Sequence, residues 1–215
     1  MNKYKKIINT FIHKNLSKTL LSQAYHGYLK DSGWIESFER QEPLSMNGDP
    51  LPWITIPCLD FMDSRLNKNV SVFEYGAGNS TLYFSKLAGN VVSVEHDREW
   101  FDKISKKSNC NISINYCSLK YDNAYCRFII NIDSCFDLIV VDGRDRVNCI
   151  KNCVEKLTHD GCIILDDSER KQYKEGIEYL TSKGFKKLDF WGVALGLTYK
   201  KCTTIFYKNN NFFGI

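Results

Sequence analysis

Two glycines and two glutamates at fixed spacing form the part of this chain with the clearest chemical use. The stretch Val72–Thr81 reads Val-Phe-Glu-Tyr-Gly-Ala-Gly-Asn-Ser-Thr, and Glu95 follows Glu74 by twenty-one residues. An apolar run that ends in an acid, turns through glycines and enters a helix-forming stretch is typical of nucleotide sites in parallel α/β sheets. Gly76 and Gly78 permit a tight turn close to a ligand, and the second acid would receive ribose hydroxyls.

The carboxylate of Glu74 distinguishes between the ligands that such a turn could hold. It would repel the pyrophosphate of a dinucleotide but attract the ammonium and sulfonium groups of S-adenosylmethionine. Thr81 also replaces the third glycine of a dinucleotide fingerprint. The motif therefore predicts an S-adenosylmethionine site, with a nicotinamide-dependent oxidoreductase as the alternative. The residues expected to bind the cofactor are Glu74, Gly76, Gly78, Asn79, Ser80, Glu95, His96, Ser118 and Asp142.

Strand-like and helix-like stretches alternate from Val70 onward, which indicates βαβ units around a parallel sheet. The expected strands are Val70–Tyr75, Val91–Glu95, Ile112–Cys117, Phe136–Asp142, Cys162–Asp166, Lys187–Trp191 and Thr203–Lys208. The expected helices are Ser80–Leu87, Arg98–Lys107, Arg146–Leu157 and Glu169–Ser182, with Asp97 as the N-cap of the second. We predict an α/β, Rossmann-like, doubly wound and mostly parallel seven-stranded sheet. The last two strands would form an antiparallel hairpin at its edge.

Several of the expected strands end in acids, and in an open parallel sheet these ends share one rim. Carboxylates near a core are costly without partners, so a cationic cofactor, a metal ion or both would supply positive charge. Asp142 is the expected catalytic residue, as general base or metal ligand. Asp166 and Asp167 would join it as ligands of Mg2+, which prefers oxygen, unless they only cap the next helix. The arginines that follow would neutralise the rim or recognise an anionic acceptor; they are Arg144, Arg146 and Arg170.

At this point the chain resembles the class I S-adenosylmethionine-dependent methyltransferases. The resemblance runs from Val70 to about Lys208 and rests on Glu74-x-Gly76-x-Gly78, on Glu95, and on the stretch from Phe136 to Gly143. Asp142-Gly143, followed by the segment from Gly161 to Asp167, is nearest to the macrocin-type and catechol-type metal-dependent O-methyltransferases. The resemblance implies methyl transfer to a hydroxyl of a small molecule or sugar, with the acids holding a divalent ion against that hydroxyl. A non-catalytic cofactor-binding module is a further alternative.

The first 69 residues are expected to form a helical, Pro- and Trp-rich N-terminal extension before a methyltransferase domain at 70–215. The basic stretch Met1–Ile8 favours an amphipathic helix that packs on the domain or on a partner, rather than a membrane-surface helix or a signal peptide. The segment from Gly33 to Pro57 contains four prolines and several large apolar residues. We expect it to form a wall or lid of the active site, with Trp53 as part of the pocket.

The overall composition bears on the partners and the cellular compartment of the protein. The chain has 215 residues and 29 basic against 25 acidic side chains, a net charge of +4 that gives no strong case for nucleic-acid binding. Its nine cysteines include no CxxC pair, which favours reduced thiols and a cytoplasmic protein. No apolar run approaches the roughly 20 residues of a membrane span, so no transmembrane segment is expected. A homo-oligomer is compatible with the sequence.

Overall fold

The computed structural model describes residues 14–107, 109–120 and 123–215. The predicted basic helix at Met1–Ile8 lies outside these residues. The described part of the chain divides into two compact units. The larger comprises Pro50–Ala194 and Thr198–Ile215, and the smaller comprises the residues up to Asp49 together with Leu195–Leu197. Residues 50–69 therefore belong by their contacts to the same unit as the sheet.

The smaller unit contains three short helices: α2 (Lys14–Ser22), α3 (Tyr28–Asp31) and α4 (Trp34–Arg40). No separate helix was predicted over the residues of α4, which open the Pro- and Trp-rich segment. Trp34 and Phe38, one turn apart, stack with ring centroids 5.3 Å apart, and the Trp34 indole donates to the Leu197 carbonyl at 2.7 Å. The Ser37 hydroxyl exchanges hydrogen bonds with the backbone of Leu44. These contacts stabilise a helix too short to be recognised from periodicity.

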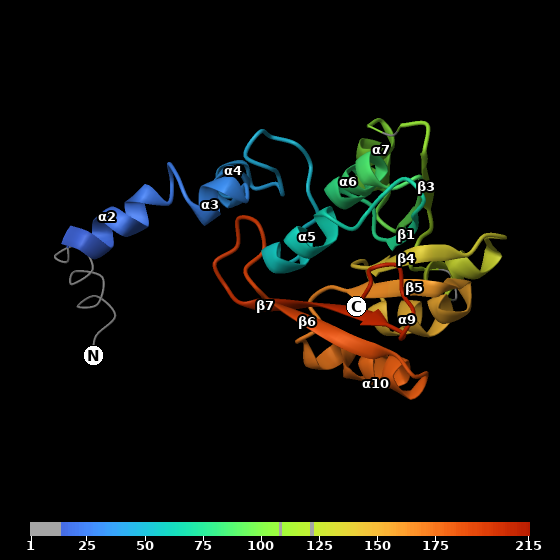
Figure 1. Ribbon diagram of the computed structural model, residues 1–215. Coiled ribbons are helices and arrows are strands. Elements are labelled where there is room, and N and C mark those ends of the chain that lie inside the picture. Colours follow the sequence, from blue (N-terminus) through green and yellow to red (C-terminus); the bar gives the residue numbers. More distant parts are fainter. Residues whose placement is uncertain (1–13, 108, 121–122) are drawn as a thin grey trace. The chain divides into compact units, whose positions relative to one another are not determined.

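The larger unit is built on a seven-stranded sheet in the order β3-β2-β1-β4-β5-β7-β6 (Figure 1). The strands are β1 (Ser71–Tyr75), β2 (Asn90–Glu95), β3 (Ile112–Tyr116), β4 (Phe136–Val141), β5 (Leu157–Leu165), β6 (Lys186–Gly192) and β7 (Lys201–Tyr207). The first five are parallel to one another, and β7 pairs antiparallel with both β5 and β6. The predicted α/β fold, with its antiparallel edge strands, is confirmed.

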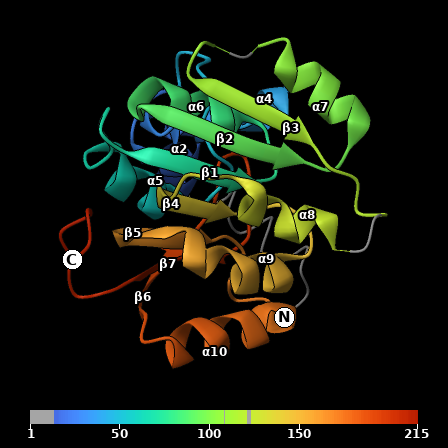
Figure 2. The same ribbon diagram turned by 90° about the vertical axis from the view of Figure 1, so that its right-hand side faces the viewer.

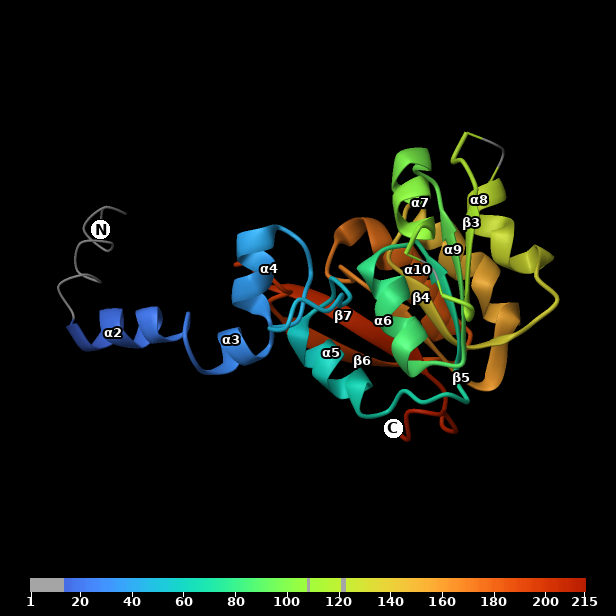
Figure 3. The same ribbon diagram turned by 90° about the horizontal axis from the view of Figure 1, so that it is seen from above.

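Helices cover both faces of this sheet (Figures 2 and 3). One face carries α5 (Ile56–Asp63), α6 (Asn79–Leu87) and α7 (Arg98–Ser105), and the other carries α8 (Ala124–Arg127), α9 (Arg146–Cys153) and α10 (Lys174–Ser182). The core between the sheet and α8–α10 includes Phe73, Tyr75, Ile139, Ile163 and Phe206, all fully buried. Central strands buried on both faces read as continuous apolar runs, which is why the sequence located them well.

Two helix boundaries differ from the expected ones by several residues. The helix predicted over 169–182 begins only at Lys174, as α10. The helix predicted over 146–157 ends with α9 at Cys153 and a short 3-10 turn, Val154–Lys156, and β5 then begins at Leu157. The amino end of β5 pairs Leu157 with Phe136, and the register shifts before Cys162 pairs with Leu138. The irregularity brings the polar residues Thr158, His159 and Asp160 into β5. An alternation of apolar and polar residues therefore does not predict where this strand begins.

The nine cysteines are free thiols, and burial raises the pKa of Cys153 and of Cys162 to about 12. Within the part of the chain that the structure describes, no helix has the length and apolar character needed to cross a membrane.

Candidate functional site

The glycine turn lies where β1 and β4, the two central parallel strands, end side by side. Gly76 has φ 92°, a conformation that L side chains rarely adopt, and its N–H donates to the Val94 carbonyl at 2.9 Å. A Cβ atom on Gly76 would lie 3.0 Å from the Cα atom of Gly143, which follows β4. The turns after β1 and β4 therefore touch backbone to backbone. The chain leaves these two strands toward opposite faces of the sheet, and in such folds ligands bind at this switch point.

Gly143 is constrained even more tightly than Gly76. A Cβ atom there would lie 2.1 Å from the Tyr125 hydroxyl and 2.9 Å from the Tyr75 carbonyl oxygen. Only glycine fits between these groups without a shift of the backbone.

Glu74 lies beneath the glycine turn and is fully buried. Its Oε2 accepts hydrogen bonds from the hydroxyls of Thr81, at 2.5 Å, and Ser93, at 3.1 Å. Its Oε1 receives no hydrogen bond of good geometry from the described residues, although the nearby Ser80 hydroxyl favours the ionised form. Burial outweighs these hydroxyls and raises the pKa of Glu74 from 4.5 to about 7. Because Glu74 Oε1 lacks a well-placed donor, it could accept a hydrogen bond from a cationic group of a bound cofactor.

Glu95 fixes the glycine turn to the end of β2. Its carboxylate accepts from the Ala77 N–H at 2.9 Å and from the His96 and Asp97 N–H groups at 2.8 Å each. Only 4% of Glu95 is exposed. The His96 ring lies beside this carboxylate, with Nδ1 2.8 Å from Oε1. The structure thus brings both acids of the motif to the turn, Glu74 below it and Glu95 beside it.

Trp100, on α7, is a site neighbour that the sequence analysis missed. Asp97 is the N-cap of α7, as predicted, and accepts from the Trp100 N–H at 2.9 Å. This start of the helix directs the Trp100 indole to the Ala77 carbonyl, to which it donates at 2.5 Å. A Cβ atom on Gly78 would lie 3.9 Å from the same indole. The sequence did contain a signal for this contact, because Trp100 lies three positions after the capping residue Asp97.

The other predicted cofactor residues lie at the start of α6 and after β3. Gly78 is the N-cap of α6, so the helix includes both Asn79 and Ser80 in its first turn. Ser118 follows β3 and accepts from the Lys120 N–H at 3.2 Å, as in an ordinary turn.

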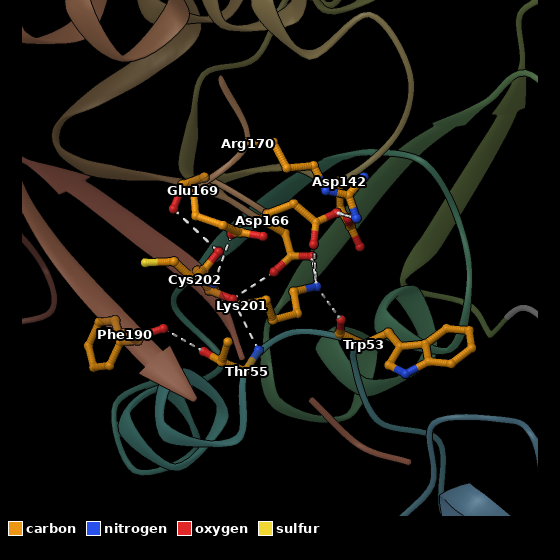
Figure 4. A network of polar contacts seen from close by, with 12 residues as sticks. Trp53, Thr55, Asp142, Asp166, Glu169, Arg170, Phe190, Lys201 and Cys202 are labelled. Carbon is orange, nitrogen blue, oxygen red and sulfur yellow. Dashed lines mark hydrogen bonds and ion pairs between the residues drawn. The ribbon is translucent and has the colours of Figure 1, made fainter. Parts of the chain in front are cut away.

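The three aspartates of the rim come together, but each meets a cationic side chain (Figure 4). Asp142 lies 2.9 Å from the buried Arg146 guanidinium. Asp166 lies 2.5 Å from the Lys201 ammonium, and Asp167 lies 2.9 Å from Arg170 and 2.8 Å from Lys201. Burial and the nearby Asp166 carboxylate raise the pKa of Asp142, while Arg146 and Lys201 oppose the rise.

This charge pairing does not fit the predicted magnesium site. The carboxylate oxygens that a hard cation would need already contact ammonium and guanidinium groups, and the described residues contain no group of three ligands that could hold a metal. Nor do Asp166 and Asp167 cap a helix, because α10 begins only at Lys174. Two of the three predicted arginines neutralise the rim, Arg146 from a buried position and Arg170 from the surface, whereas Arg144 is exposed.

Part of the expected wall lies at this rim. Trp53 belongs to the larger unit, and its carbonyl oxygen accepts from Lys201 at 3.4 Å (Figure 4). The Trp53 residue is 42% exposed, so it is not a core residue. The earlier part of the predicted segment, from Gly33 to Asp49, belongs to the smaller unit.

A cavity of about 540 Å³ lies elsewhere, at the amino end of β5 and so at the opposite end of the sheet from the glycine turn. Its lining includes Leu157, His159, Phe185, Lys186 and Lys208. None of the predicted site residues lines it.

Comparisons with known proteins agree with the fold. No family model and no curated protein matches the sequence. Among solved structures, a precorrin-6y C5,15-methyltransferase from Geobacter metallireducens GS-15 is similar, with a TM-score of 0.56 and 14% identity over 72% of this chain and 88% of that one. A putative methyltransferase from Streptococcus mutans in complex with SAH gives 0.50 and 14% over 69% and 94%. An rRNA methylase from Streptococcus thermophilus gives 0.50 and 13% over 71% and 96%. These three structures are all named as methyltransferases, and the two whose names give a substrate act on a precorrin and on rRNA. The expectation of no nucleic-acid partner stays a prediction.

Proposed function

We propose that this protein binds S-adenosylmethionine at the glycine turn and transfers its methyl group to a hydroxyl oxygen of a small molecule or sugar. The observation that carries this proposal is the pair Glu74 and Glu95, which flank a glycine turn at the switch point of the sheet. The methyltransferase fold of the neighbouring structures supports it, as does the SAH held by one of them.

The cofactor would lie across the turn. Glu95 would receive the ribose hydroxyls, Glu74 would favour the cationic end, and the backbone of Gly76 and Gly78 would permit close approach. The other proposed contacts come from Asn79, Ser80, His96, Ser118 and Asp142. The indole of Trp100, which contacts the turn, is a further candidate neighbour.

Asp142 is the proposed general base. It is the least buried of the three rim aspartates, with 27% of its side chain exposed. The acceptor O–H would give its proton to Asp142 as the oxygen forms a bond to the methyl carbon. Bound S-adenosylmethionine would supply that methyl group, and its C–S bond would break to leave the thioether S-adenosylhomocysteine. Most of the acceleration would come from holding the three reacting atoms in line. No step uses a metal ion.

The decisive measurement is calorimetry with S-adenosylhomocysteine and with NAD. We expect binding of the first and none of the second, and tighter binding of NAD would refute the proposal. Glu95→Gln removes the charge and keeps one oxygen, for either the Ala77 N–H or the His96 and Asp97 N–H groups, so it should weaken S-adenosylhomocysteine binding by roughly 1.5–3 kcal/mol, tenfold or more. Glu99→Gln, an exposed change on α7, is the matched control and should leave affinity unchanged. Equal affinities of the two variants would show that Glu95 does not touch the cofactor.

The acceptor can be sought with methyl-labelled S-adenosylmethionine and a panel of hydroxylated metabolites and sugar nucleotides. Label that appears on an acceptor oxygen supports O-methylation. Transfer only to carbon, nitrogen or RNA would refute that part of the proposal while leaving cofactor binding intact.

A further inference from the structure

Lys201, the first residue of β7, is a buried cation at the acidic rim. Only 4% of the residue is exposed. Its ammonium lies 2.5 Å from Asp166 Oδ2 and 2.8 Å from Asp167 Oδ1, and it donates to the Trp53 carbonyl at 3.4 Å (Figure 4). A buried ammonium is costly unless opposite charges surround it, so this position needs a reason beyond packing.

The environment of Lys201 is that of a bound cation. Oxygens from two carboxylates and one carbonyl converge on one positive charge, which is the donor set that a hard metal ion would take. Asp167 gains further positive neighbours in Arg170, at 2.9 Å, and Arg146, at 3.5 Å. The acid pair is therefore neutralised from within the chain.

The same cluster ties the segment around Trp53 to the sheet. Asp166 Oδ1 accepts from the Thr203 hydroxyl at 2.6 Å, and that hydroxyl accepts from the Thr55 N–H at 3.0 Å. Together with the bond from Lys201 to Trp53, this gives two links from one aspartate to residues 53–55. The charge pair thus sets the position of the backbone that carries the exposed Trp53 indole.

We propose that Lys201 is a positioning residue that replaces a divalent cation at this rim: it holds Asp166 and Asp167 together and fixes the Trp53 segment to them. The inference rests on the proposed function only where it treats Trp53 as a wall of the acceptor site. The part of the inference that concerns charge balance depends only on Lys201, Asp166 and Asp167.

The test is whether removal of the ammonium creates a metal site. Lys201→Met keeps much of the stem but leaves the two carboxylates without their shared cation. We expect this variant to bind one Mn2+ per chain by electron paramagnetic resonance, and Mn2+ to raise its melting temperature. Wild type, Lys201→Arg and Lys200→Met should do neither. Arg keeps the charge, and Lys200 is an exposed neighbour that contacts the Trp191 ring.

Two results would overturn the inference. One is tight stoichiometric Mn2+ binding by wild type, which would mean that the acids serve a metal despite Lys201. The other is a folded Lys201→Met variant that binds no more Mn2+ than wild type. If Lys201→Met does not fold, Lys201→Met/Asp166→Asn should recover folding because it removes both charges of the pair. Failure to recover would show that charge balance is not what Lys201 supplies.

These readouts separate the inference from the proposed function. Mn2+ binding and melting temperature need neither cofactor nor acceptor, so they remain informative if S-adenosylhomocysteine does not bind. Conversely, cofactor binding by wild type together with tight Mn2+ binding would leave the methyl-transfer proposal standing and reject the role of Lys201.

Discussion

Replacing Glu74 by glutamine should make the protein more stable above neutral pH. Burial raises the pKa of this carboxyl from 4.5 to about 7. The folded protein therefore binds more protons than the unfolded chain between those values, and its free energy of unfolding falls as pH rises through the window. At ~1.4 kcal/mol per pKa unit, the difference amounts to about 3 kcal/mol. Glutamine resembles the protonated acid and escapes this loss.

Urea unfolding of wild type and Glu74→Gln at pH 5, 6, 7 and 8 measures the effect. The stability gain of the variant should be small at pH 5 and approach about 3 kcal/mol at pH 8. Glu99→Gln, an exposed change on α7, is the matched control. A gain that does not vary with pH, or a variant less stable than wild type at pH 8, would refute the reasoning. The second result would mean that the ionised form is the one that the hydroxyls of Thr81 and Ser93 require.

Two further changes test the turn and the wall. Gly143→Ala places a methyl group 2.1 Å from the Tyr125 hydroxyl, so it should cost about 1–3 kcal/mol of stability by chemical denaturation, and less in a Tyr125→Phe background; equal costs in both backgrounds would show that the hydroxyl is not the obstacle. Trp53→Ala should weaken cofactor or acceptor binding while changing the melting temperature little, because the residue is 42% exposed. Trp191→Ala, at 48% exposure on β6, is its control, and a sharp fall in melting temperature with intact affinities would assign Trp53 a purely structural role.

The sheet was predictable because its signals are local. The strand that ends at Tyr75 and the strand Phe136–Val141 are apolar runs bounded by turn residues, and both appear within a residue of their predicted limits. The capping role of Asp97 was equally local, since the side chain bonds to an N–H three residues along.

The composition of the rim was not predictable in the same way. The aspartates were found because they end strands, but their partner Lys201 is 35 residues from Asp166 and lies on a strand that enters the sheet antiparallel. No local sequence pattern predicts the ion pair between Lys201 and Asp166. Without it, three neighbouring carboxylates favour a metal ion, and the magnesium prediction followed. Helix α4 was missed for a related reason, because its stabilising contacts, such as that of Trp34 with Leu197, join distant parts of the chain.

The contact between Gly76 and Gly143 bears on how a site of this kind can diversify. Each position already has the smallest residue, so a larger side chain at one cannot be compensated by a smaller one at the other. The contact between the two turns therefore leaves no room for a side chain, and these two positions should remain glycine together in any relative that keeps this backbone path. Under the proposed function, differences in acceptor preference would have to arise away from these turns, at exposed residues such as Trp53.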